Sequence, residues 1–449
     1  MQDNEFITAA PEKEGKLTED VKPEKKPKLK ADKHIWGLYI ALCIISIIEL
    51  YSASSREVAS STMGVYGPIV RHCSMLFVGL LLMLTLQRIH YKWFIPLIPL
   101  FAFASALMMV YVMFFGDVIN GARRSFSLFG VMIQPAEFLK LSAAMVIALV
   151  MSRNQMPHGV KTRGVAICAA TVIIFGGLLF NQGLTNTILL MSISLSMMLI
   201  GGVQWKKFGV VLIAYGVIAA GALWWKMESA EERAEKLKAG IKVEQMDGNR
   251  HETIKTDRSG TWQARIDRFL GDSIPKYDKP ITADNRQEMY AYMAQANGGL
   301  FGVFPGNSRE AARLPLAFSD YIYSIIIEDM GFVGGMFVLI LYLWLLARAG
   351  AIARRCSRAF PAMLVIGMAV MIVFQALFHM AIVTGVFPVS GQPLPLISKG
   401  GSSILITSIA FGVMLSVSRY AVRSGKKQEI KQEMNALPES VRADNPTQI

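Results

Sequence analysis

The sequence predicts an all-α polytopic membrane protein, with about ten transmembrane helices and a large extracytoplasmic loop between the seventh and the eighth. Three observations support this fold class. Hydrophobic residues make up 53% of the 449 residues and charged residues only 18%, and the mean hydropathy is +0.40. The hydrophobic residues form runs of about 20, the length that crosses a hydrocarbon core of roughly 30 Å. Lys and Arg gather between these runs, as membrane topology requires.

The apolar runs predict the spans in chain order. They are 35–53, 68–86, 93–115, 136–152, 164–181, 185–203, 208–225, 321–347, 360–384 and 402–420. An even number of spans puts both ends of the chain on one side. Basic residues at both ends indicate that this side is the cytoplasm, because cytoplasmic segments carry an excess of Lys and Arg. The loops predicted to be cytoplasmic carry such clusters too, at 88–92, 153–163, 206–207 and 348–358.

The spans divide the chain into a transmembrane domain, 35–424, and two cytoplasmic tails. The tails, 1–34 and 425–449, are charged and poor in aromatic residues, which is typical of solvated segments, and the basic first tail also suits anionic lipid. The first span is expected to act as an uncleaved start-transfer helix. The outer insertion, 226–318, is too long for a plain connector, so we expect a lid, a partner surface or part of a substrate site.

Charge and cysteine content exclude two classes of function. The formal charge of +13 does not indicate nucleic-acid binding, because much of the Lys and Arg lies in tails and short loops beside the apolar runs. The four cysteines are far apart and lack the spacing of metal ligands. They are expected to be packing residues, and no redox chemistry follows from them.

Basic residues before the fourth span are the first candidates for a site. Arg123 and Arg124 lie on the outer side, where topology does not need positive charge, so they are candidates for binding an anion. Gln134 then precedes Glu137 and Lys140, whose spacing of three puts both on one face of the next helix. An ion pair within the helix would explain the two charges. Ionisable groups inside a membrane are expensive, however, which favours a function.

An acidic residue ends the glycine-containing segment 298–320. Asp320 stands where an apolar helix starts, and it has two explanations. It could cap the helix by accepting backbone N–H bonds, or it could act as a general base at the membrane edge, beside a cavity lined by basic residues. Glu328 and Asp329 lie deeper in the span, where they must pair or face a wet cavity.

Prolines and glycines prevent a regular helix within 384–403, although the segment lies at membrane depth. Such backbone is tolerated where it is buried in protein or lines water, so a cavity wall and a re-entrant structural loop both remain open. If the segment is a cavity wall, its backbone N–H groups together with Lys399 could hold a phosphate. Arg71 and His72, at the outer start of the second span, give a weaker signal that a surface pair would also explain.

At these segments the sequence resembles the SEDS family of bacterial membrane proteins (shape, elongation, division and sporulation). The resemblance covers most of 35–424. The motifs occur in family order, and they are NGARR with QPAEFLKL, GGLFG with PGNS, SDYIYSIIIEDMGFVGG and TGVFPVSGQPLPLISKGGSS. The SDYIYSIII and ISKGG stretches look closer to the division branch of the family than to its elongation branch.

The resemblance implies an inverting peptidoglycan glycosyltransferase at the outer face of the bacterial cytoplasmic (inner) membrane, at the division septum. It would polymerise lipid II, the undecaprenyl-pyrophosphate-linked disaccharide-pentapeptide. The family's catalytic Asp falls on Asp320, and the candidate cations for the pyrophosphate are Arg123, Arg124, Lys140 and Lys399. Supporting residues would be Gln134, Glu137, Asn307, Ser308, Glu328, Ser402 and Ser403. Expected partners are a class B penicillin-binding protein, other divisome proteins and membrane lipid, while no cofactor is specified and a divalent cation is left open.

The sequence departs from the family pattern at several positions. Residues 316–319 are Leu-Ala-Phe-Ser, where the family often has Glu-Ala-His-Thr, so no imidazole stands in the stretch just before Asp320. His379 stands where the family usually has Asn, and Lys399 where Tyr is common. Three alternatives therefore stay open, namely a lipid II flippase, the elongation-type polymerase, and a scaffold whose loop 226–318 recruits partners.

Overall fold

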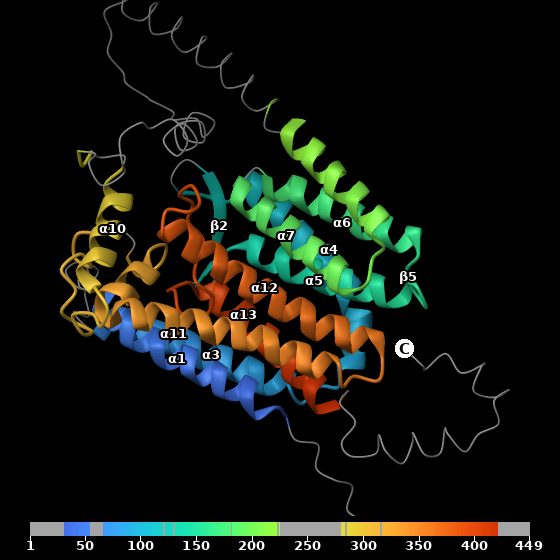
Figure 1. Ribbon diagram of the computed structural model, residues 1–449, viewed down its shortest axis with the longest axis horizontal. Helices are drawn as coiled ribbons and strands as arrows, with labels where there is room; N and C mark the ends of the chain where they lie inside the picture. Colours follow the sequence, from blue (N-terminus) through green and yellow to red (C-terminus); the bar gives the residue numbers. More distant parts are fainter. Residues whose placement is uncertain are drawn as a thin grey trace, which may run out of the picture. The chain divides into compact units, whose positions relative to one another are not determined.

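The computed structural model describes residues 31–53, 66–119, 122–128, 131–180, 182–221, 224, 280–282, 285–314 and 317–420. Most of these residues form a bundle of long helices (Figure 1). Before the large insertion the helices are α1 (Lys33–Ala53), α3 (Tyr66–Leu86), η1 (Tyr91–Trp93), α4 (Phe94–Phe115), α5 (Pro135–Arg153), α6 (Thr162–Phe180) and α7 (Leu184–Ile200). Within and after it they are α10 (Arg286–Gly298), α11 (Ile322–Ala353), α12 (Ala359–Val383) and α13 (Gly401–Tyr420).

The predicted membrane fold is confirmed, and the spans can be compared one by one within the described residues. Eight helices there are long and apolar enough to cross a membrane. The predicted span 185–203 corresponds to α7, which at 17 residues is shorter, and the predicted span 208–225 corresponds to helical residues 205–221. Of the predicted tails and outer loop, residues 1–30, 425–449 and most of 226–318 lie outside the described part.

Three helices form the centre of the bundle. Within their most apolar windows, 72% of the residues are buried in α5, 78% in α12 and 83% in α13, against 22% in α3. Other parts of the protein therefore surround α5, α12 and α13, whereas most of the surface of α3 is free to contact lipid. Two of the candidate site segments lead into these central helices, the strand segment before α5 and the irregular segment between α12 and α13.

Two glycines allow α3 and α13 to pack closely. A Cβ atom added at Gly79 would lie 2.5 Å from the Ser408 Oγ, and one at Gly412 would lie 2.8 Å from the Leu86 Cβ. Small residues at a helix interface let the backbones approach, which is a common way for membrane helices to associate. Tyr39 of α1 joins the same contact, with its hydroxyl 3.0 Å from the Ser408 hydroxyl.

A glycine interrupts α11 and explains the GGLFG motif of the preceding loop. Gly331 has φ of +71°, a conformation that side chains disfavour, and the helix breaks there. The chain after α10 packs into this break, because the N–H of Val303 donates to the Glu328 carbonyl at 2.9 Å and that of Phe332 to the Gly299 carbonyl at 2.9 Å. Gly302 has φ of +80°, and a Cβ there would lie 2.2 Å from the Asp329 carbonyl oxygen.

A small antiparallel sheet, which the sequence analysis did not predict, lies between α4 and α5. It consists of β1 (Asp117–Ile119), β2 (Ala122–Leu128) and β3 (Val131–Ile133) in the order β1-β2-β3. The segment that carries the candidate arginines is therefore a strand, whose successive side chains point to opposite faces. Another strand pair, β4 (Gln155–Met156) and β5 (Gly159–Val160), closes the turn between α5 and α6.

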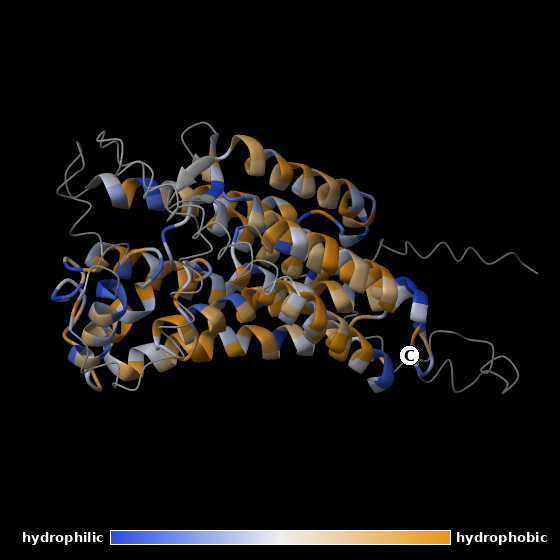
Figure 2. Cartoon of the chain, turned by 90° about the horizontal axis from the view of Figure 1, so that it is seen from above, coloured by the Kyte–Doolittle hydropathy of each residue, from blue (hydrophilic) through white to orange (hydrophobic). Residues whose placement is uncertain are grey.

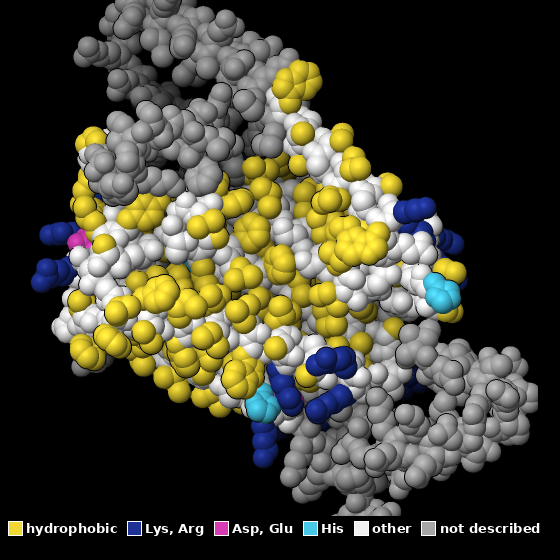
Figure 3. All heavy atoms as spheres, in the orientation of Figure 1, with side chains coloured by type: hydrophobic (Ala, Val, Ile, Leu, Met, Phe, Trp, Pro, Cys, Tyr) yellow, Lys and Arg dark blue, Asp and Glu magenta, His cyan; other side chains and the backbone are white. Residues whose placement is uncertain are grey.

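The surface of the bundle has the distribution expected of a membrane protein. In Figure 2 the helices are largely hydrophobic, and hydrophilic residues lie mainly toward their ends. Figure 3 shows hydrophobic side chains across the middle of one face, with Lys and Arg gathered toward the ends of the bundle. The exposed apolar side chains include Phe103, Phe115, Trp205 and Val210, each more than 60% exposed, as expected where hydrocarbon is the solvent.

Candidate functional site

A cavity of about 370 Å³ brings together segments that are far apart in the sequence. Its walls come from the start of α3, from β2 and the end of β3, from the turn before α11, and from the irregular segment before α13. Its polar and glycine residues are Arg71, His72, Arg124, Ser125, Gln134, Ser319, Asp320, Gly391, Lys399, Gly400, Gly401, Ser402 and Ser403. Four of the segments singled out from the sequence thus meet at one place.

Asp320 lies in the wall of this cavity, in a turn before α11. The N-cap position of α11 belongs to Tyr321, so Asp320 does not occupy the capping position that the sequence suggested as an alternative. The Ser319 hydroxyl donates to the Asp320 Oδ1 at 3.0 Å. Gly391 leaves room for the other oxygen, because a Cβ there would lie 2.7 Å from Oδ2. The carboxylate is therefore fixed by its neighbours while it borders the cavity.

The segment before α13 is hydrogen-bonded to the turn that carries Asp320. The Lys399 N–H donates to the Phe318 carbonyl at 2.9 Å, and the Ser398 hydroxyl donates to the Ser319 carbonyl at 2.7 Å. The Lys399 ammonium lies 4.9 Å from the centre of the Phe318 ring, a distance suited to a cation–π contact. The irregular segment lines the cavity, and these contacts hold the backbone of Lys399 to the turn that carries Asp320.

The cationic side of the cavity combines side chains with a helix end. Lys399, Arg71 and Arg124 all border it, and Ser402 and Ser403 lie in the first turn of α13. The first N–H groups of a helix have no partner within the helix, and the helix dipole favours an anion there. The Ser402 hydroxyl accepts a hydrogen bond from the Gln134 N–H at 3.3 Å, which joins the start of α5 to the same place.

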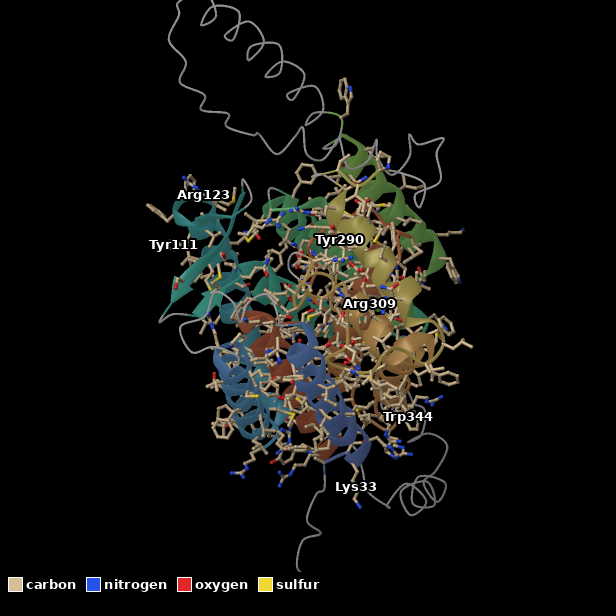
Figure 4. All side chains as sticks on the ribbon, turned by 90° about the vertical axis from the view of Figure 1, so that its left-hand side faces the viewer. Lys33, Tyr111, Arg123, Tyr290, Arg309 and Trp344 are labelled. Carbon is tan, nitrogen blue, oxygen red and sulfur yellow. The ribbon has the colours of Figure 1, made fainter. Side chains whose placement is uncertain are left out.

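Arg123 does not belong to this cavity. Its guanidinium donates to the carbonyl of Phe114, at the end of α4, and the side chain is exposed. Figure 4 shows Arg123 at the outer edge of the small sheet, pointing away from the bundle. Arg123 and Arg124 are neighbours on β2, so the alternation of a strand sends one side chain outward and the other to the cavity.

Lys140 and Glu137 do not line the cavity but lie beneath its wall. The Lys140 ammonium is 2.7 Å from the Glu137 Oε1, and the two side chains are 0% and 4% exposed. Gln375 of α12 completes this cluster, with its Oε1 3.4 Å from Lys140 Nζ and its Nε2 3.4 Å from the Pro393 carbonyl. The intrahelical ion pair considered from the sequence is therefore present, and it supports the segment that forms the cavity wall.

Glu328, Ser308 and Asn307 form another region, away from the cavity. The buried Glu328 carboxylate accepts hydrogen bonds from the Arg309 N–H at 3.1 Å, from Asn297 at 3.3 Å and from the Ser308 hydroxyl. The Asn307 side chain donates to the Val303 carbonyl at 3.0 Å. These residues order the loop between α10 and α11.

Some residues of the cavity carry little or no signal in the sequence. Arg71 and His72 gave only a weak signal, because nothing local distinguishes them from a surface pair at a helix end. Gly391 and Gln375 were not singled out, since their contacts join segments that are distant in the sequence. Within the described part of the chain, no group of three or more His, Cys, Asp and Glu side chains is placed to hold a metal ion.

Comparison with curated proteins gives relatives that match nearly the whole chain. It is 28% identical over 390 residues to a probable peptidoglycan glycosyltransferase FtsW of Trichlorobacter lovleyi, a match covering 85% of this chain and 91% of the relative. It is 24% identical over 403 residues to the peptidoglycan glycosyltransferase MrdB of Escherichia coli, covering 88% of this chain and 96% of the relative. Relatives of both names therefore align with most of this chain.

A solved structure and a family model agree with these relatives. The fold matches a chain from a study of polymerization and crosslinking by a peptidoglycan synthase complex, with a TM-score of 0.63, 24% identity, and coverage of 87% of this chain and 98% of that one. The model of the FtsW/RodA/SpoVE family, described as "Cell cycle protein", matches residues 32–242 and 260–423. The chain therefore belongs to the FtsW/RodA/SpoVE family of cell cycle proteins, the SEDS family that its motifs indicated.

Proposed function

We propose that this protein is a peptidoglycan glycosyltransferase of the division type, which polymerises lipid II into glycan strands with Asp320 as the general base. The observation that carries the proposal is the cavity, which one carboxylate, three basic side chains and a helix N-terminus all border. An acid–base residue and an anion site are what glycosyl transfer from a pyrophosphate requires. The relatives named as peptidoglycan glycosyltransferases support the reaction class.

In this mechanism Asp320 removes the proton from the 4-hydroxyl of the N-acetylglucosamine of one lipid II. The hydroxyl oxygen forms a bond to the anomeric carbon of the N-acetylmuramic acid at the pyrophosphate end of the growing chain. The bond from that carbon to the phosphate oxygen breaks, and the electron pair leaves with the pyrophosphate. Attack opposite to the leaving group inverts the anomeric carbon. The hydrogen bond from the Ser319 hydroxyl holds the carboxylate in position, and Gly391 leaves room for it because it has no side chain.

The pyrophosphate gains negative charge as it leaves, and the basic residues of the cavity would hold it. Lys399, Arg124 and Arg71 are the cations placed there, and the first N–H groups of α13 add donors. Fixed donors that meet charge as it develops are usually the largest contribution to catalysis. Lys140 and Arg123, which the sequence also suggested for this role, act elsewhere, Lys140 as a buried support and Arg123 at the outer edge of the sheet.

The protein is expected to act with a class B penicillin-binding protein at the septum, with both termini in the cytoplasm. The match to a chain from a study of a peptidoglycan synthase complex supports such a pairing, and the SDYIYSIII and ISKGG motifs favour the division type. Depletion of the protein in cells tests the assignment. Filamentous cells would support division, whereas round cells would point to elongation.

The decisive experiment measures polymerisation of labelled lipid II by wild-type, Asp320→Asn and Glu288→Gln protein, each with its penicillin-binding protein and with transpeptidation blocked by penicillin. The two variants make the same change from carboxylate to amide, but Glu288 lies on α10 outside the cavity. We expect Asp320→Asn to lower the rate by about 100-fold or more, the usual contribution of a general base, and Glu288→Gln to leave it unchanged.

Equal rates for all three proteins would disprove the role of Asp320. If the wild type makes no glycan, transfer of labelled lipid II across vesicle bilayers is measured next, because a flippase would move it without joining sugars. If translocation occurs and persists in Asp320→Asn, the protein is a lipid II transporter and not a polymerase.

A further inference from the structure

Buried side chains of the central helices hold the irregular segment that lines the cavity. The prolines of this segment have no N–H group, and a backbone carbonyl at membrane depth is costly unless it finds a donor. Three carbonyls of the segment accept hydrogen bonds from buried side chains, and the pairs are Gln392 with His379 at 2.6 Å, Pro393 with Gln375 at 3.4 Å, and Pro395 with Tyr342 at 2.6 Å. The cavity wall is therefore attached to α11 and α12 through these side chains.

His379 makes the one of these contacts that lies closest along the chain to the part of the wall beside Asp320. Gln392, whose carbonyl it meets, directly follows Gly391. Gly391 packs against the Asp320 carboxylate, because a Cβ added there would lie 2.7 Å from Oδ2 and 3.5 Å from Oδ1. A shift of the Gln392 carbonyl would therefore move the backbone that borders the carboxylate.

The contact itself determines which nitrogen of His379 carries a proton. A backbone carbonyl oxygen can only accept, so the Nδ1 atom 2.6 Å from it must be the donor. The side chain lies on α12 and is 1% exposed, and its Nε2 atom has no hydrogen-bond partner among the described residues. A charged ring would leave a second buried N–H without an acceptor, which favours the neutral ring. His379 therefore supplies one hydrogen bond to the wall.

The residue that His379 contacts is also held from a second helix. The Gln392 side chain donates through Nε2 to the Asn186 Oδ1 of α7 at 2.9 Å, and both residues are buried. Two helices, α12 through the backbone carbonyl and α7 through the side chain, thus fix the residue that follows Gly391.

We propose that His379 is a positioning residue for glycosyl transfer, whose Nδ1–H holds the Gln392 carbonyl and thereby keeps Gly391 in place against Asp320. The inference rests on the proposed role of Asp320 as general base. His379 does not border the cavity, so it acts through the backbone of the wall. A general base must lie within hydrogen-bond distance of the proton it removes, and a misplacement of about 1 Å can slow a reaction about 100-fold.

Two substitutions of similar shape separate the hydrogen bond from the packing of the ring. His379→Asn keeps an N–H group near the place of Nδ1, whereas His379→Leu provides a side chain of nearly the same size without a donor. We expect His379→Leu to lower kcat for polymerisation of lipid II about 10- to 100-fold with little change in KM. His379→Asn should stay within about threefold of the wild type. If His379→Leu does not fold, His379→Gln replaces it, because its longer side chain carries the amide toward the place of Nε2.

Ser105→Ala controls for the loss of a buried hydrogen bond as such. Ser105 of α4 is buried and lies 2.8 Å from the Ser142 hydroxyl, and neither serine borders the cavity. We expect this variant to have a lower thermal unfolding midpoint and a polymerisation rate within about twofold of the wild type. Unfolding midpoints of all variants show that each is folded at the temperature of the assay.

The Asp320→Asn background tests whether His379 acts through the carboxylate. If it does, the residual rates of His379→Asn and His379→Leu should differ by less than about twofold in that background, because residues that act as one unit are not additive. Equal rates of the two variants without Asp320→Asn would overturn the proposal. So would a difference that persists in full when Asp320→Asn has made polymerisation slow.

The same measurements distinguish a failure of the proposed function from a failure of this inference. If Asp320→Asn alone polymerises at the wild-type rate, the general base is wrong. A rate of His379→Asn far above that of His379→Leu would even then support the positioning of the wall by His379, whereas equal rates would remove that role as well.

Discussion

At the scale of single residues, the two adjacent arginines show how the fold selects among candidates of the same chemistry. Arg124 borders the cavity, whereas Arg123 is exposed and donates to backbone carbonyls at the end of α4. The alternation of side chains on β2 separates them. The pair therefore gives a matched comparison, in which each variant removes one positive charge at nearly the same place in the chain.

We expect Arg124→Ala to lower kcat/KM for polymerisation of lipid II by about 10- to 100-fold, because a hydrogen bond to a charged group contributes about 1.5–3 kcal/mol. Arg123→Ala should stay within about twofold of the wild type, since an exposed group away from the cavity contributes little. Both are measured with the assay used for Asp320. Equal losses in the two variants would mean that only the total charge of this segment matters.

At the scale of whole elements, one carboxylate ties the start of α1 to the end of α11. The Asp32 oxygens accept hydrogen bonds from the Arg348 Nε at 3.0 and 3.1 Å. They also accept the N–H groups of His34 at 2.9 Å and of Ile35 at 3.3 Å, which is the pattern of a helix N-cap. Residues 31–34, part of the predicted tail, thus belong to the bundle, and α1 begins two residues before the predicted span.

The contacts of Asp32 make a prediction about stability and pH. Burial by itself raises the pKa of Asp32, but the hydrogen bonds from Arg348 and the two N–H groups outweigh it, and the pKa lies below its ordinary value. The carboxylate therefore stabilises the fold above the unfolded-state pKa of about 3.9 and loses this effect as the pH falls through the folded-state pKa. Because Asn caps a helix about as well as Asp, Asp32→Asn removes mainly the charged contact with Arg348 and should lower the unfolding free energy by about 0.5–1 kcal/mol at pH 7.

The measurement is thermal unfolding of detergent-solubilised protein at pH 7 and again at a pH well below 3.8, the ordinary pKa of an Asp side chain. The difference between wild type and Asp32→Asn should shrink in acid, because the wild-type carboxylate is then protonated as well. Lys33→Gln is the control, since Lys33 is exposed and Figure 4 shows it pointing away from the bundle. A difference that is the same at both pH values would show that the carboxylate charge is not involved.

At the scale of the whole molecule, the cavity and the basic loops lie at different ends of the bundle. Figure 1 shows β2 and α10 toward one end and β5 toward the other. The Lys207 ammonium donates to the Val160 carbonyl at 2.8 Å, which places the basic residues 206–207 at the β5 end. Since cytoplasmic loops are rich in Lys and Arg, we propose that the β5 end is cytoplasmic and that the cavity opens on the outer side.

Labelling of single cysteines checks this orientation. In a protein whose four native cysteines are replaced, we expect a membrane-impermeant maleimide to label Arg309→Cys in intact spheroplasts. Lys206→Cys should react only after the membrane is permeabilised. Both native side chains are exposed, so access to the reagent is limited only by the membrane. The opposite labelling pattern would show that the protein has the reverse topology, with the cavity on the cytoplasmic side of the membrane.

The sequence by itself determined the membrane fold, the position of each apolar run and the family. These properties depend on local composition and on motifs read along the chain, and hydrocarbon imposes helices wherever a run is long enough to span it. The motifs at Asp320 and Lys399 were also recognisable, since acids, bases and broken helices at membrane depth are conspicuous against an apolar background.

Only the tertiary structure decided which candidates share a site. It joined Arg124, Lys399 and Asp320 in one cavity, placed Lys140 beneath the wall, and turned Arg123 outward. It also placed His72 of α3 at the cavity that Asp320 borders, although more than half of the chain separates the two in the sequence. Contacts of this kind depend on how helices pack through space, and neither hydropathy nor spacing along the chain records which face of one helix meets another.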